Sequence, residues 1–243
     1  AGWFAETILA GRMVHLFGSG HSRILVEEMW PRYGSFPGFN PIVELSLSFH
    51  NLVVGSNGQR QAMFLENVGG LATRILRNFD LSPKDCAMVA SSSGCNRVPV
   101  EMAEEFRRRG VKVVAIISRR HSEASESRHP SGRRLQDFAD LVLDTGAPVG
   151  DAMVRVEGLD TPVAPGSTIG GCLLINSIKA INQNYILWGF ASRALDFFVT
   201  FVAHVHDAES FACAHLHFVV HLGDERAHRV DDVTATPAGL GDD

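Results

Sequence analysis

Short apolar runs alternate along the chain with segments whose apolar residues follow helical spacing. The run 111–117 is almost entirely β-branched, which is typical of a strand buried on both faces of a parallel sheet. Helical spacing between such runs, as in 61–79, predicts strands and helices in alternation and therefore a doubly wound α/β domain. The predicted strands are 13–17, 42–45, 86–90, 111–117, 140–144 and 152–156.

The first strand runs directly into a loop of glycine and serine that opens an amphipathic helix, 23–30. Glycines let the backbone approach a ligand, and the N–H groups of such a turn favour an anion. The loop matches neither the dinucleotide fingerprint, because Arg23 stands where the third glycine belongs, nor the ATP-binding P-loop. A tight turn without a ligand is the alternative. The candidate binding residues are Gly18, Ser19, Gly20 and Ser22, with His21 beside them.

The same pattern returns after the strand 86–90, where a serine-rich loop precedes a helix over 98–109. Hydroxyl and N–H groups without positive charge suit a phosphate monoester on a small polyol better than a nucleotide. In the alternative interpretation the serines only cap the helix and solvate the turn. The candidate residues here are Ser91, Ser92, Ser93 and Asn96.

Three motifs, in this order and spacing, resemble the sugar isomerase (SIS) domain family, in particular its bacterial single-domain, phosphoheptose-isomerase-like branch. They are 17–22 (FGSGHS), 91–94 (SSSG) and 128–135 (RHPSGRRL), and the resemblance covers about residues 3–182. It implies a flavodoxin-like, three-layer α/β sandwich that binds a phosphosugar at the carboxyl ends of its strands, as a homodimer or homotetramer. The family's phosphate-binding serines would be Ser19 and Ser22 in the first loop and 91–93 in the second.

Glu66 is the leading candidate for a catalytic base. It lies within the first turns of the predicted helix 61–79, where desolvation towards a sugar would make a carboxylate more basic. A solvated glutamate on the polar face of the helix is the alternative. In related isomerases a glutamate on the corresponding helix abstracts the proton, and the resemblance favours Glu66 for that reason. His129 and His21 are candidate acids for ring opening, and Ser167 is either a helix cap or a third ligand donor.

These residues and the resemblance together predict a metal-independent sugar-phosphate isomerase of the aldose-ketose type, which removes a proton alpha to a carbonyl. A lyase or etherase acting on an amino-sugar phosphate is one alternative, and a non-catalytic phosphosugar sensor is another. No nucleotide, metal or other cofactor is expected.

Composition excludes several other classes. The net charge of −5 and the absence of a basic block argue against nucleic acid as a partner. The four cysteines are scattered, which favours a reducing cytosol without disulfides. The longest apolar stretch, 190–205, is interrupted by Arg193 and Asp196, so no membrane span is expected. We therefore expect a cytoplasmic protein.

The pattern also suggests where the domain ends. Residues 1–182 form the expected SIS domain, and because the sequence starts without methionine, 3–9 are expected to be the last turns of a longer helix. Residues 183–243 form a divergent tail without an assigned domain. The tail has histidines at 204, 206, 215, 217 and 221, a spacing compatible with zinc, but no cysteine or carboxylate pattern supports a metal site.

Overall fold

The computed structural model describes residues 1–201 with the exception of 32, 34, 49–54 and 56–57. The chain divides into two compact units, Ala1–Ser192 and Arg193–Asp243, and only 193–201 of the second are described. The domain border predicted at residue 182 lies within the helix Ser167–Phe201, and it stays a prediction. Within the described residues no helix has the length and apolar character needed to cross a membrane.

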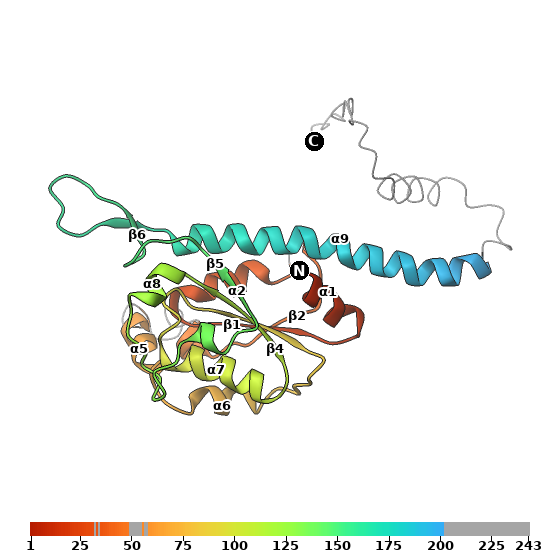
Figure 1. Cartoon of the computed structure of the whole chain (residues 1–243), viewed down its shortest axis with the longest axis horizontal. Helices are drawn as coiled ribbons and strands as arrows, with labels where there is room; N and C mark the ends of the chain where they lie inside the picture. Colours follow the sequence, from red (N-terminus) through yellow and green to blue (C-terminus); the bar gives the residue numbers. More distant parts are fainter. Residues whose placement is uncertain (32, 34, 49–54, 56–57, 202–243) are drawn as a thin grey trace, which may run out of the picture. The chain divides into compact units, whose positions relative to one another are not determined.

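Five parallel strands form the central sheet of the first unit, in the order β2-β1-β3-β4-β5 (Figure 1). This is the strand order of the flavodoxin-like fold, so the predicted fold class is confirmed. The ends of β1 and β3 are in register, because Gly18 pairs with Ala90. The strands are β1 (Val14–Gly18), β2 (Phe39–Pro41), β3 (Cys86–Ala90), β4 (Lys112–Ile117) and β5 (Leu141–Asp144).

Helices cover both faces of this sheet and complete a three-layer sandwich (Figure 1). One face packs against α1 (Gly2–Leu9), α2 (Arg23–Met29) and the first turns of α9 (Ser167–Phe201). The other face packs against α3 (Leu45–Ser48), α6 (Leu71–Leu76) and α7 (Arg97–Arg108). The connections contain α5 (Gly58–Leu65), α8 (Arg119–Glu123) and two short 3-10 turns, η1 (Gly20–Ser22) and η3 (Leu135–Asp137).

The strands are apolar on both faces because both faces are covered. In β3, Met88 belongs to the cluster under α1, α2 and α9, while Val89 belongs to the cluster under α6 and α7. Val113 and Val114 of β4 divide between the two clusters in the same way. Alternate residues of an almost uninterrupted apolar run thus supply two separate cores.

Two predicted strands differ from the structure. The strand expected at 42–45 is displaced to β2, and the chain turns into α3 at Leu45. Ile42 is buried all the same, in the connection that leads to α3, so its apolar character reflects the core and not a strand. Pro41 is compatible with β2 because this strand lies at the edge of the sheet.

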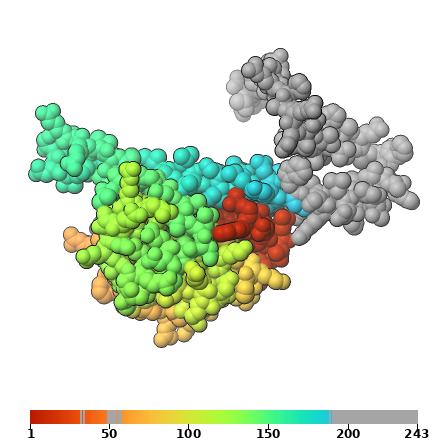
Figure 2. Space-filling view, in the orientation of Figure 1, coloured from red at the N-terminus to blue at the C-terminus, as the bar shows by residue number. Residues whose placement is uncertain are grey.

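The strand expected at 152–156 exists in part but does not join the central sheet. β6 (Ala152–Val154) pairs antiparallel with β7 (Val163–Pro165) as a separate hairpin. Figure 2 shows this hairpin projecting from the rest of its unit, and its strand residues are mostly exposed.

The single helix predicted at 61–79 is wrong, because the chain forms α5 and α6 with a turn between them. Gly70 adopts φ +76°, a left-handed conformation that glycine accepts without strain. Its N–H donates to Glu101 Oε2 at 2.8 Å, so a contact with α7 stabilises the turn. Glu66 consequently follows the end of α5 and does not lie in the first turns of a long helix.

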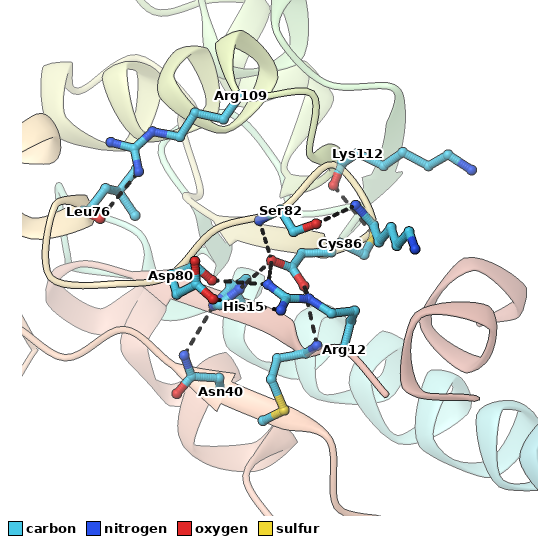
Figure 3. Close-up of polar contacts among 12 residues, drawn as sticks. Arg12, His15, Asn40, Leu76, Asp80, Ser82, Cys86, Arg109 and Lys112 are labelled. Carbon is cyan, nitrogen blue, oxygen red and sulfur yellow. Dashed lines mark hydrogen bonds and ion pairs between the residues drawn. The ribbon is translucent and has the colours of Figure 1, made fainter. Parts of the chain in front are cut away.

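A buried polar cluster joins the strands at the opposite, amino-terminal edge of the sheet (Figure 3). The Asp85 carboxylate accepts a hydrogen bond from Arg12 Nε at 2.8 Å, and His15 Nε2 lies 3.4 Å from its other oxygen. Asn40 of β2 contacts His15 Nδ1 at 3.1 Å. The cluster therefore ties β1, β2 and β3 together at the edge away from the loops that were predicted to bind a ligand.

Candidate functional site

A cavity of about 190 Å³ lies at the carboxyl edge of the sheet. Parallel strands end at the same edge, so the loops that follow neighbouring strands meet there. Both glycine- and serine-rich loops reach this cavity, together with residues that follow β4 and β5 and the start of α9. Of the residues predicted from the sequence, it is lined by Ser19, Gly20, His21, Ser22, Glu66, Ser91, Ser92, Ser93, Asn96 and Ser167.

Two predicted residues do not line this cavity. Gly18 ends β1, and a Cβ atom there would come within 2.6 Å of the Ser22 carbonyl oxygen, so glycine permits the sharp return of the loop. The ring of His129 is engaged elsewhere: Nε2 lies 3.4 Å from Glu104 Oε2 and Nδ1 lies 2.7 Å from Ser131 Oγ. Gly18 and His129 therefore lie outside the set of predicted residues that line the cavity.

Ser19 connects the first loop to Glu66. It is 6% exposed, and its Oγ donates a hydrogen bond to Glu66 Oε2 at 2.8 Å. The following Gly20 adopts φ +56° and starts η1, whose Ser22 N–H donates to the Ser19 carbonyl oxygen at 3.1 Å. The loop thus holds Ser19 facing the segment that follows α5.

The backbone of Glu66 contacts the second loop's helix. Its carbonyl oxygen accepts a hydrogen bond at 2.8 Å from the N–H of Val98, in the first turn of α7. Its own N–H donates to the Ala62 carbonyl oxygen at 2.9 Å, which continues α5 by one bond. Glu66 therefore bridges the two loops, with the side chain bound to the first and the backbone bound to the helix after the second.

The three serines of the second loop differ in what they contact. Ser91 Oγ accepts from the Gly94 N–H at 3.2 Å, and Ser93 Oγ accepts from the Cys95 N–H at 3.3 Å. These two hydroxyls hold the loop in shape; neither caps α7, whose N-cap residue is Asn96. Ser92 Oγ is buried and has no hydrogen-bond partner among the described residues. An unsatisfied buried hydroxyl in a cavity wall is a position where a ligand or water would bind.

Ser167 and Asp151 form the side of the cavity at the start of α9. The Ser167 N–H donates to Asp151 Oδ1 and the Ser167 hydroxyl to Asp151 Oδ2, both at 2.7 Å. Asp151 reaches them from a left-handed conformation, φ +67°. Asp151 thus caps the helix, and both donors of Ser167 are already engaged.

His121 is a cavity residue that the sequence reasoning missed. It lies in α8 directly after β4, in a segment that resembles solvated, mixed-charge surface in the sequence. Its Nδ1 accepts a hydrogen bond from the Gly150 N–H at 3.1 Å, across 29 residues of chain. The one available signal was its place just beyond the carboxyl end of a predicted strand, where ligands of this fold bind.

The charges at the cavity are negative. The carboxylates of Glu66 and Asp151 line it, and the described lining residues include no lysine or arginine. An anionic ligand would therefore depend on hydroxyl, N–H and imidazole donors. The whole of the described chain contains no group of three or more His, Cys, Asp or Glu side chains that could hold a metal. The histidines at 204, 206, 215, 217 and 221 lie outside the described residues.

Comparison with known proteins agrees with this architecture. The family model of the SIS domain matches residues 1–118. A UPF0309 protein of Listeria monocytogenes serotype 4b is 37% identical over 187 residues, which is 74% of this chain and 73% of that protein. A UPF0309 protein of Halalkalibacterium halodurans is 37% identical over 174 residues, 72% of this chain and 69% of that protein. The chain belongs to the UPF0309 family of SIS domain proteins.

Solved structures resemble this UPF0309 protein more distantly. A phosphoheptose isomerase from Francisella tularensis is 14% identical, with a TM-score of 0.45, covering 75% of this chain and 82% of that one. The sugar isomerase domain of an RpiR transcription factor from Sphaerobacter thermophilus is 19% identical, with a TM-score of 0.42, covering 80% of this chain and 85% of that one.

Proposed function

We propose that this SIS domain protein binds a phosphorylated monosaccharide in the cavity between its two loops and interconverts the aldose and ketose forms. The observation that carries the proposal is the bridge made by Glu66, which brings a carboxylate to two loops rich in hydroxyl donors. A volume of about 190 Å³ is below the usual range of drug-sized pockets, roughly 300–1,000 Å³, and suits a small polar ligand better than a nucleotide.

The phosphate group would be bound by the serine-rich loop after β3. Ser92 supplies a hydroxyl without a protein partner among the described residues, and Asn96 caps α7 without using its side chain. Hydroxyl and amide donors bind a phosphate without an arginine or lysine. The resemblance of both loops to those of SIS proteins supports the same assignment.

Glu66 would act as the base. A carboxylate within reach of the carbon beside a carbonyl can take its proton and return it to the neighbouring carbon, which converts an aldose into a ketose. The Ser19 hydroxyl donates to one carboxylate oxygen and orients the group at the cavity wall. The conversion is redox-neutral, so the proposal includes no electron-transfer cofactor. A homodimer or homotetramer in the cytoplasm stays a prediction from the sequence.

Solvent exchange tests the proposal. The protein is incubated in D2O with a panel of aldose and ketose phosphates, and NMR follows deuterium incorporation beside the carbonyl. We expect exchange with at least one sugar phosphate, and its loss in Glu66→Gln with binding retained. Glu104→Gln, at a partly exposed position beside His129 and outside the cavity, is the matched control and is expected to exchange normally. Binding without exchange for every sugar would overturn the isomerase and leave a phosphosugar sensor, whereas release of a substituent would indicate a lyase.

A further inference from the structure

His121 is fixed at three points beside the cavity. Its backbone N–H donates to the Ser118 hydroxyl at 3.3 Å, and its carbonyl oxygen accepts from the Ser125 hydroxyl at 2.7 Å. Ser118 is fully buried and donates in turn to the Ala147 carbonyl oxygen at 2.7 Å. The third point is the ring itself, where Nδ1 accepts from the Gly150 N–H. This imidazole is held by its own helix and by the turn after β5.

The contact with Gly150 determines which ring nitrogen carries the proton. A backbone N–H only donates, so Nδ1 must present its lone pair, and the proton of the neutral ring lies on Nε2. A protonated ring would place an N–H on Nδ1 against the N–H of Gly150. Nε2 has no partner among the described residues, and it is therefore the donor that His121 offers to a ligand in the cavity.

The strand order places His121 and Glu66 on two sides of the serine loop. Glu66 is bound to Ser19, which follows β1, while His121 follows β4, and β3 with its serines lies between these strands. Two strand spacings amount to about 10 Å. A ligand whose phosphate is bound by the central loop could thus place its sugar between a carboxylate on one side and an imidazole N–H on the other.

From this arrangement we infer that neutral His121 donates its Nε2–H to the oxygen that becomes negative during the isomerisation, an inference that rests on the proposed function. Glu66 takes the proton from C2, the C–H electron pair forms the C1–C2 double bond, and the carbonyl electron pair moves to O1. His121 stabilises this enediolate oxygen. The proton of the O2 hydroxyl then passes to O1, and Glu66 returns its proton to C1 to give the ketose. Every proton is accounted for, and His121 remains neutral throughout.

The two histidines predicted from the sequence, His21 and His129, are less suited to this role. His21 lines the cavity but is exposed, and no hydrogen bond to its ring is found among the described residues. His129 lies outside the cavity, against Glu104 and Ser131. Among the histidines that the structure describes, only His121 combines a place in the cavity wall with a ring fixed in one tautomer.

Two measurements test the inference. Nitrogen-15 NMR of the protein labelled at histidine reports the tautomer directly. We expect the ring signals that disappear in His121→Ala to be those of an imidazole protonated at Nε2. In the exchange assay His121→Ala is expected to lower the rate about 10²- to 10³-fold, the usual effect of removing one donor to a developing oxyanion, while affinity for inorganic phosphate is kept. His121→Gln, which retains a side-chain N–H, should recover part of the rate, and His129→Gln should exchange like the unmodified protein.

The outcomes separate the inference from the proposed function. Full exchange in His121→Ala, or a ring protonated at Nδ1, overturns the role of His121 and leaves the isomerase with Glu66 intact. Absence of exchange in the unmodified protein overturns the isomerase and the role of His121 together. Loss of phosphate affinity in His121→Ala would assign the residue to phosphate binding and would also overturn the inference.

Discussion

Ser19 and Glu66 are 47 residues apart in the sequence, and their side chains are joined by a 2.8 Å hydrogen bond at the edge of the cavity. Ser19 is buried, so little water competes for this contact. The hydroxyl donates to one carboxylate oxygen and thereby fixes the plane of the group. In the proposed reaction this bond orients the base.

Replacing Ser19 by alanine should therefore slow the exchange reaction. A hydrogen bond to a charged group contributes about 1.5–3 kcal/mol, which corresponds to a fall in rate of roughly 10- to 100-fold if the bond persists in the transition state. Deuterium incorporation in D2O measures the effect. Ser131→Ala, which removes a hydroxyl outside the cavity, is the control. An unchanged rate in Ser19→Ala would show that the bond does not orient the base.

Ser91 and Ser92 are adjacent, and their substitution by alanine should have different consequences. Ser91→Ala leaves the buried Gly94 N–H without its partner, which costs about 1–3 kcal/mol of unfolding free energy. Ser92→Ala removes a hydroxyl that has no partner among the described residues, so the free energy of unfolding should stay within about 0.5 kcal/mol.

For affinity towards the sugar phosphate we expect the reverse, with the larger loss in Ser92→Ala. Ser92→Ala is expected to weaken binding of the sugar phosphate roughly five- to tenfold, the effect of about 1 kcal/mol from one hydrogen bond. Urea unfolding and isothermal titration calorimetry, carried out on both variants, measure the two quantities. A destabilised Ser92→Ala with normal affinity would contradict the assignment of this hydroxyl to the ligand.

Asp151 places a negative charge at the start of α9, inside a cavity that is proposed to bind an anion. Asparagine keeps one oxygen that can accept from the Ser167 N–H, and its amide can donate to the Ser167 hydroxyl, so Asp151→Asn should keep the fold while it removes the negative charge. We expect affinity for inorganic phosphate to rise roughly five- to tenfold, from an electrostatic change of about 1 kcal/mol.

Titration calorimetry at constant ionic strength measures this gain. Asp160→Asn makes the same change of charge in the exposed hairpin and should leave the affinity as it was. A weaker affinity in Asp151→Asn would mean that the carboxylate assists binding, for example by holding Ser167 in place.

The sequence predicted the fold because its information is local. Met88 and Val89 lie on opposite faces of β3, and the apolar character of each predicts burial without knowledge of its neighbours. Few sheet topologies are compatible with buried strands that alternate with helices along the chain. The parallel arrangement then places the loops after β1 and β3 at the same edge. The grouping of Ser19 with Ser92 follows from the topology without knowledge of any side-chain contact.

Other parts of the site depend on contacts between distant residues. The turn that places Glu66 is stabilised by the bond between Gly70 and Glu101, and the helical spacing on either side of it gave no sign of the break. His121 becomes a candidate through Gly150, 29 residues away. His129 had as good a sequence context, and its contacts with Glu104 and Ser131 show that it lies elsewhere.

His15 should make the stability of the protein depend on pH. Burial lowers the pKa of its imidazole from the ordinary 6.5, although Asp85 partly offsets this effect. Burial raises the pKa of the Asp85 carboxyl, but hydrogen bonds from Arg12 and the Ser82 N–H outweigh this effect and hold that pKa below its ordinary value. Asp85 therefore stays ionised at neutral pH, and the proton balance of the cluster near neutrality depends on His15 (Figure 3).

The sign follows from the two states of the chain. The folded pKa of His15 lies below the unfolded value, so the unfolded chain binds more protons as the pH falls below about 6.5. The contribution of His15 to the free energy of unfolding is fully present above about pH 6.5 and is lost as the pH falls through its folded pKa. Urea unfolding at about pH 7.5, 6.5 and 5.5 should show a falling free energy of unfolding, with a smaller slope in His15→Gln. Ser82→Ala keeps the backbone donor to Asp85 and should keep the slope, whereas an equal slope in His15→Gln would assign the dependence to other groups.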